Sequence, residues 1–179
     1  MNLKIFFDKI RPLFGGKMNQ SQVDGINFLY DNIVVSEIID KRMAAYIFAT
    51  VFHETAKTMQ PIEEIGKGKN KEYGKPDPVT GHTYYGRGYV QLTWKYNYDC
   101  ASRELEYDFV NNPDAVMQPD NAVVIMVKGM SQGWFTGKKL SDYFNLKTDF
   151  VGARKIINGT DKAEVIGGYA KSFYDALNS

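Results

Sequence analysis

The feature that most restricts the fold is a change of pattern at residue 61, where helical periodicity gives way to a stretch rich in glycine and proline. The residues that form this stretch are Pro61, Gly66, Gly68, Gly74, Pro76, Pro78, Gly81, Gly86 and Gly88. Glycine and proline interrupt regular structure, and irregular connections of this length inside compact domains are uncommon and usually functional. We therefore expect helices on either side of one long loop that carries a functional site.

Apolar residues recur at three- and four-residue spacing on both sides of the loop, which is typical of amphipathic helices. The predicted helices cover residues 19–34, 37–57, 97–107, 120–132 and 161–177, with a further helix that starts at residue 148 or 149 and a short turn near residue 140. In the sequence YVQLTW, polar and apolar residues alternate. This alternation predicts a short extended segment with Gln91 and Thr93 on its polar side and Trp94 in the core.

The length and composition predict one folded domain that is mainly α-helical. A chain of 179 residues with 44% hydrophobic and 24% charged residues is typical of a globular domain and argues against disorder. We expect N-terminal helices in residues 1–60, a loop with a short sheet in 61–98 and C-terminal helices in 99–179. The sequence shows no repeat and no linker, so the predicted domain spans residues 1–179.

The charge pattern argues against a nucleic-acid partner. Lysine plus arginine, 22 residues, nearly balance aspartate plus glutamate, 21 residues, so no global field attracts a polyanion. A local excess lies in the loop, at Lys67, Lys69, Lys71 and Lys75. This cluster is either a solvated surface or a guide toward an anionic polymer.

The sequence predicts synthesis in the cytoplasm without a signal peptide. Asp8 and Lys9 interrupt the apolar residues near the N-terminus, and no stretch approaches the ~20 apolar residues of a membrane-spanning helix. The single cysteine, Cys100, excludes an intrachain disulfide, and we interpret it as a buried or incidental thiol. We expect a monomer without stable membrane insertion.

A candidate general acid lies near the end of the second predicted helix. Glu54 projects from a largely apolar helix, where partial desolvation would raise the pKa of a carboxyl group. The alternative is a glutamate that points into solvent at the helix end. His53 and Glu54 do not form an HExxH motif because residue 57 is lysine, so a zinc protease is excluded. We expect no metal and no organic cofactor.

A second carboxylate follows in the sequence PIEEIG. Hydrolysis of a glycoside with inversion needs two carboxyl groups about 6.5–9.5 Å apart, with a water between them. Glu63 or Glu64, just beyond the helix that carries Glu54, can meet this spacing. Two solvated glutamates are the alternative.

The segment GHTYYGRGYVQLTWKYNY combines aromatic rings with amide side chains. Aromatic faces suit the CH groups of a sugar ring, and amides suit its hydroxyl and acetamido groups. Tyr84 and Tyr85 can stack on sugars or pack inside the fold, and Arg87 can reach substrate or hold the loop through a carboxylate. The segment indicates a saccharide-binding surface.

The order of FHETAKT, PIEEIG, YYGRGYVQLTWKYNY, NNPDAV and IINGT resembles that of family 19 glycoside hydrolases, which include chitinases and peptidoglycan-cleaving endolysins of bacteriophages. The short loop between the glutamates resembles the phage branch. The resemblance implies a two-lobed, lysozyme-like fold with a small β element, in which a long loop lies beside the cleft. It also implies hydrolysis of a β-1,4 bond beside an N-acetylated sugar.

The resemblance further implies roles for single residues. Glu54 would be the general acid, Glu64 the general base with Glu63 as fallback, and Thr93 would hold the attacking water. Positions expected to contact sugar, including a stacking tyrosine, are Tyr85, Gln91, Tyr96, Asn97 and Asn158.

The resulting functional hypothesis is an endolysin-type hydrolase of the peptidoglycan glycan strand. Without a signal peptide, it would need a holin-type release partner to reach the wall, which only the resemblance implies. The alternatives are a chitinase acting on chitin oligomers and a catalytically silent cell-wall-binding module.

Overall fold

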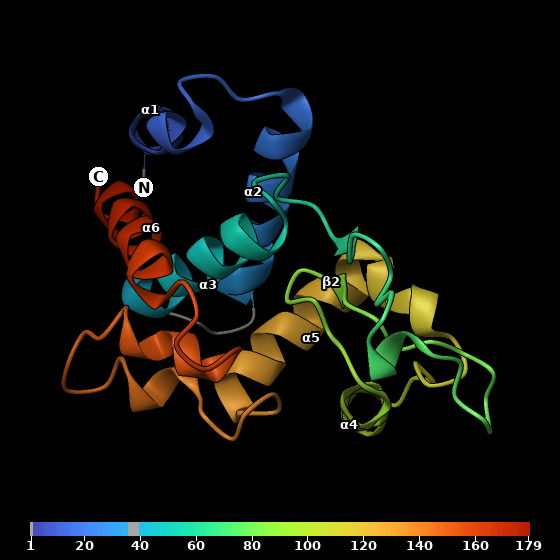
Figure 1. Ribbon diagram of the computed structural model, residues 1–179. Helices are drawn as coiled ribbons and strands as arrows, with labels where there is room; N and C mark the ends of the chain where they lie inside the picture. The colour runs from blue at the N-terminus through green and yellow to red at the C-terminus, as the bar shows by residue number, and fades with distance from the viewer. Residues whose placement is uncertain (1, 36–39) are drawn as a thin grey trace.

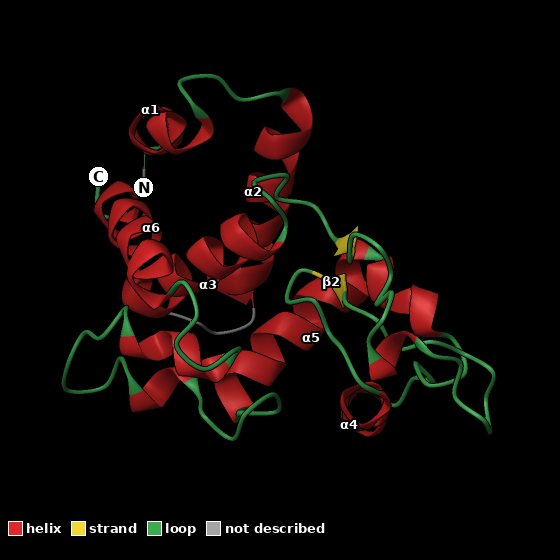
Figure 2. Cartoon of the chain, viewed as in Figure 1, coloured by secondary structure: helices red, strands yellow, loops and turns green. Residues whose placement is uncertain are grey.

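The computed structural model describes residues 2–35 and 40–179 of the chain, and it is mainly helical (Figure 1). The α-helices are α1 (Leu3–Ile10), α2 (Gln20–Val35), α3 (Lys41–Glu54), α4 (Lys95–Leu105), α5 (Pro119–Gln132) and α6 (Ala163–Leu177). Five short 3-10 helices are η1 (Arg11–Phe14), η2 (Glu72–Gly74), η3 (Pro113–Met117), η4 (Leu140–Asp142) and η5 (Gly152–Ile156). The two strands, β1 (Ile62–Glu63) and β2 (Arg87–Gly88), pair antiparallel (Figure 2).

Helix α3 forms the centre of the larger of two hydrophobic cores. Its residues 44–52 are all buried, as the uncharged run in the sequence predicts. Phe48 stacks on Phe173 of α6 with ring centroids 5.5 Å apart, and Phe52 meets the same ring edge-on. Aromatic pairs in these geometries add to the free energy gained by burial. The packing of α6 against α3 (Figure 1) therefore fixes the position of the C-terminal end of α3, which carries Glu54.

A second, smaller core lies under the loop region and α4. Its buried rings include Tyr84, Tyr98 and Phe109, and Ile125 of α5 completes it. The neighbouring Met126 of the same helix belongs to the larger core. Helix α5 thus joins two lobes, which confirms the predicted two-lobed, mainly α architecture (Figure 1).

A buried arginine holds the small lobe together. The side chain of Arg87 is 3% exposed, and its Nε donates to Asp114 Oδ1 at 3.0 Å. Its Nη1 donates to the carbonyl of Thr83 and to the hydroxyl of Tyr98, and its guanidinium lies 3.7 Å from the centre of the Tyr85 ring. Arg87 therefore holds the loop through a carboxylate, as one of its two predicted roles requires, and it does not line the pocket.

Three expectations about local structure need correction. The predicted extended segment at residues 89–94 is a turn, because Arg87 bridges to Leu92 and Gln91 takes a positive φ of 53°. The helix predicted over 37–57 ends at Glu54, and its predicted start at residues 37–39 lies outside the described residues. The segment after residue 149 forms the 3-10 helix η5 instead of an α-helix.

Specific caps explain where α3 begins and ends. The side chain of Asp40 accepts from the backbone N–H of Arg42 at 2.8 Å, which satisfies a free donor at the N-terminus. Beyond the helix, Ala56 and Lys57 have positive φ, so the chain turns away. None of the helices in the described part of the chain is long and apolar enough to cross a membrane.

Candidate active site

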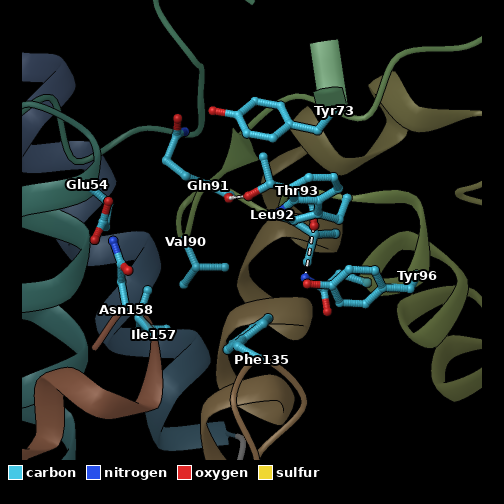
Figure 3. Close-up of a pocket in the computed structure, with 12 residues that line it drawn as sticks. Glu54, Tyr73, Val90, Gln91, Leu92, Thr93, Tyr96, Phe135, Ile157 and Asn158 are labelled. Atoms are coloured by element: carbon cyan, nitrogen blue, oxygen red, sulfur yellow. Dashed lines mark hydrogen bonds between the residues drawn. The ribbon is translucent and has the colours of Figure 1, made fainter. Parts of the chain in front are cut away.

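A pocket of about 440 Å³ lies between the two lobes. The residues that line it are Glu54, Tyr73, Val90, Gln91, Leu92, Thr93, Trp94, Tyr96, Asn97, Phe135, Ile157 and Asn158. Figure 3 shows Glu54 and Asn158 on one wall and the turn around Gln91 and Thr93 on the other. The pocket therefore brings together side chains from α3, from the segment after β2 and from the segment after η5.

Glu54 faces a buried arginine and not the apolar surrounding expected from the sequence. Nη1 of Arg154 lies 2.5 Å from Oε1 of Glu54, and the two side chains are 3% and 16% exposed. Nε of Arg154 donates to the carbonyl of Asp161 at 2.9 Å, which fixes the guanidinium. The solvent-directed alternative for Glu54 is therefore wrong. The ion pair holds its carboxyl group in one orientation at the pocket wall.

The adjacent glutamates point to different partners. Glu63 accepts from the hydroxyl of Tyr85 at 2.6 Å and pairs with Nζ of Lys67 at 2.8 Å. The Lys67 ammonium, and after it the Tyr85 hydroxyl, hold the pKa of Glu63 below its usual value. Glu64 accepts instead from the hydroxyl of Tyr73 at 2.9 Å and from the backbone N–H of Gly86 at 3.1 Å.

Glu64 is the glutamate closer to the pocket. It does not itself line the cavity, but Tyr73, its hydrogen-bond partner, does. A Cβ atom on Gly86 would lie 2.8 Å from Oε1 of Gln91 and 3.3 Å from Cβ of Glu64. Glycine at position 86 therefore lets the side chains of Glu64 and Gln91 approach the same piece of backbone.

Side-chain hydrogen bonds join the turn that carries Gln91 and Thr93 to β1 and to Asn97 in the first turn of α4. Nε2 of Gln91 donates to the carbonyls of Ile62 at 3.0 Å and Gly88 at 3.3 Å. The Thr93 hydroxyl donates to the carbonyl of Gln91 at 2.9 Å, and Nδ2 of Asn97 donates to the carbonyl of Thr93 at 2.8 Å. No donor among the described residues bonds to the amide oxygens of Gln91 and Asn97 or to the Thr93 hydroxyl, so these oxygens can accept from a ligand.

Exposed aromatic rings form one side of the pocket. Trp94 is 42% exposed and lies nearly parallel to Tyr96, with ring centroids 6.4 Å apart. Tyr73 meets Trp94 edge-on at 5.3 Å. Trp94 also has a positive φ of 70°, and strained residues of this kind concentrate at functional sites. The prediction that Trp94 belongs to the core is wrong.

The structure brings most of the predicted site residues together. Those that line the pocket are Glu54, Gln91, Thr93, Tyr96, Asn97 and Asn158. Glu64 lies next to it, and Tyr85, which is 5% exposed, packs against Arg87 away from the pocket walls. Sequence reasoning missed Arg154 and Tyr73, because the sequence does not reveal that they contact the two predicted carboxylates.

The sequence of this chain is similar to those of chitinases. Residues 63–143 match the chitinase class I family. The chain is 32% identical over 128 residues to an acidic endochitinase of Dioscorea japonica, with 69% of this chain and 49% of that protein covered. It is 34% identical over 123 residues to chitinase 6 of Oryza sativa subsp. japonica, covering 66% and 43%. The chain spans about half the length of the curated relatives it matches.

Solved structures share the fold. Chitinase C from Streptomyces griseus aligns with a TM-score of 0.67 at 22% identity, over 98% of this chain and 76% of that one. A bacterial family 19 chitinase aligns with a TM-score of 0.56 at 23% identity, over 96% and 92%. These alignments confirm the predicted mainly helical, lysozyme-like fold with a small sheet.

Proposed function

Because the match over residues 63–143 and the shared fold support membership in glycoside hydrolase family 19, we propose that this chain hydrolyses β-1,4 glycosidic bonds beside an N-acetylated sugar. The observation that carries the proposal is the pocket itself. The carboxyl group of Glu54 lies on one wall, and the Gln91 amide and Thr93 hydroxyl lie on the other. An acid facing water- and sugar-binding groups across one cavity is suited to glycoside hydrolysis.

The proposed mechanism is a single displacement with inversion. Glu54 in its protonated form donates its proton to the leaving glycosidic oxygen, and Glu64 accepts a proton from the attacking water. The Thr93 hydroxyl donates to the Gln91 carbonyl, so its lone pairs can accept from that water. Asn97 and Asn158 offer amide groups, and Trp94 and Tyr96 offer aromatic faces, to the sugar chain.

As substrate we propose the peptidoglycan glycan strand. The observation that favours it lies in the loop that carries Tyr73. Lys67 and Lys75 in this loop pair with Glu63 and Glu72. Lys69 and Lys71 are exposed and have no carboxylate partner within the described residues. Two exposed ammonium groups in the loop that carries Tyr73 suit a glycan whose peptide stems carry carboxylates, whereas chitin is uncharged.

Chitin is the second candidate substrate. It is favoured by the similarity to curated proteins, since the two relatives described above carry the names acidic endochitinase and chitinase 6. The shared part of both proposals is the β-1,4 bond of an N-acetylated glycan.

The test is incubation of the purified protein with peptidoglycan sacculi and, separately, with chitin hexamer. Products are identified by mass spectrometry, and the first anomer formed from a soluble substrate is observed by proton NMR. We expect muropeptides from sacculi and an α-anomer at early times. Chitin fragments alone would favour the chitinase, a β-anomer would contradict inversion, and binding without products would indicate the silent wall-binding module.

A double lysine variant tests the role of Lys69 and Lys71. A Lys69→Gln/Lys71→Gln variant is expected to lose activity on sacculi at low salt while keeping its activity on any neutral oligomer that the wild type cleaves. At high salt the two proteins should approach each other on sacculi, because salt screens exposed charges. Equal activity of both proteins on sacculi at every salt concentration would contradict a role for these lysines.

A further inference from the structure

Two tyrosine–glutamate pairs occur on neighbouring residues of β1 and the loop after it. Tyr85 donates to Oε1 of Glu63 at 2.6 Å, and Tyr73 donates to Oε1 of Glu64 at 2.9 Å. The chemistry of the two pairs is the same, and their surroundings differ. The first pair is joined to Lys67 and packs on Arg87, whereas the second has no cation partner within the described residues.

Only the second pair reaches the pocket. Tyr73 lines the cavity. In Figure 3 its hydroxyl points toward Gln91 and toward the wall that carries Glu54. Glu64 accepts from this hydroxyl at Oε1, and its other oxygen, Oε2, accepts from the backbone N–H of Gly86. Both oxygens of Glu64 are therefore fixed, one by backbone and one by a side chain of the pocket wall.

We propose that Tyr73 is a positioning residue that sets the carboxylate of Glu64 for its work as general base. This inference rests on the proposed function. A carboxylate free to rotate would present its lone pairs to the water only part of the time, and holding it in one orientation removes that cost from the reaction. The geometry also favours Glu64 over Glu63, because Tyr73, the partner of Glu64, lines the cavity, whereas Tyr85 and Lys67, the partners of Glu63, do not.

The ring and the hydroxyl of Tyr73 have separable roles. The ring packs edge-on against Trp94, with centroids 5.3 Å apart, and this contact does not need the hydroxyl. Partial burial, together with the bond to Glu64, raises the pKa of Tyr73, so the hydroxyl remains a donor over the working pH range. Tyr73→Phe therefore removes the hydrogen bond while keeping the aromatic contact.

The experiment compares the steady-state kinetics of five proteins on the glycan that the wild type cleaves: the wild type, Tyr73→Phe, Tyr85→Phe, Glu64→Gln and the double variant Tyr73→Phe/Glu64→Gln. We expect Tyr73→Phe to lower kcat at least tenfold with less than a threefold change in KM. Its loss should exceed that of Tyr85→Phe by at least tenfold.

The double variant separates positioning from general loop packing. If Tyr73 acts through Glu64, adding Tyr73→Phe to Glu64→Gln should change the remaining rate by less than twofold. Equal losses in both backgrounds, or an unchanged kcat in Tyr73→Phe, would overturn the inference while leaving the proposed function standing. A wild type without activity on either glycan would overturn both.

Discussion

Nη1 of Arg154 lies 2.5 Å from Oε1 of Glu54, although the two residues are 100 positions apart in the chain. The contact joins the end of α3 to η5, which is followed by the segment that carries Asn158. Because the arginine is buried and tied to the carbonyl of Asp161, it leaves Glu54 little freedom. The ion pair thus places the proposed acid at the pocket wall and connects that placement to the stability of the large lobe.

The first prediction concerns this ion pair. Arg154→Met leaves the mostly buried carboxylate of Glu54 without a partner, so the free energy of unfolding should fall by about 3 kcal/mol. Adding Glu54→Gln to this variant removes the unpaired charge and should restore at least half of the loss. Urea unfolding of the wild type, both single variants and the double variant measures this. Strictly additive losses would contradict the account.

The second prediction concerns Trp94. Trp94→Ala removes a ring exposed in the pocket, and an aromatic contact of about 1.5 kcal/mol corresponds to roughly a tenfold rise in KM. Trp94→Gly removes the same ring, and glycine adopts the positive φ of this position without strain. We expect the two variants to share the raised KM while Trp94→Gly has the higher melting temperature. A KM equal to that of the wild type in both would exclude Trp94 from substrate binding.

The third prediction uses two adjacent glycines of α6. A Cβ on Gly168 meets nothing within 4 Å, so Gly168→Ala should stabilise the helix by about 0.5–1 kcal/mol. A Cβ on Gly167 would lie 3.0 Å from Cγ2 of Val151, so Gly167→Ala should stabilise less or destabilise. Thermal unfolding of both variants gives the comparison. A higher melting temperature for Gly167→Ala than for Gly168→Ala would show that α6 packs differently.

The fourth prediction concerns stability in acid. The backbone N–H of Thr80, with further donors from Val79 and Lys95, lowers the pKa of Asp77 below its usual value. A carboxyl group whose pKa is lower in the folded state stabilises the fold above its ordinary pKa of about 3.9, and this contribution is lost as the pH falls.

We therefore expect Asp77→Asn to melt at a lower temperature than the wild type at pH 7. The two melting curves should converge between about pH 5 and pH 2.5. Circular dichroism melts at several pH values in this range measure the difference. Parallel curves would mean that the charge of Asp77 adds nothing to the fold.

The elements that were predicted correctly are those with long regular patterns. The uncharged run 44–52 is buried in α3, and the periodic segments near residues 120 and 161 form α5 and α6. Loop and turn geometry was harder to predict. The alternation in YVQLTW places side chains on opposite sides only if the backbone is extended. Positive φ angles at Gln91 and Trp94 turn the chain instead and expose Trp94 in the pocket.

Contacts between distant segments explain what the sequence could not show about the site. Glu54 was found from its place at the end of an apolar helix, but the arginine that faces it lies in η5 and meets it only when α3 and α6 pack. Likewise, nothing in PIEEIG separates Glu63 from Glu64. The difference appears only in their partners, Tyr85 and Lys67 for one and Tyr73 and Gly86 for the other.

The central claim is that Glu54 supplies the proton that breaks the glycosidic bond, and Glu54→Gln tests it most directly. Glutamine has nearly the same shape, and its amide cannot donate a proton to the leaving oxygen in this way. With the glycan that the wild type cleaves, we predict that turnover falls at least a thousandfold, while the circular dichroism spectrum and the dissociation constant for the glycan stay close to those of the wild type. Turnover within tenfold of the wild type would contradict the role of Glu54 as the acid.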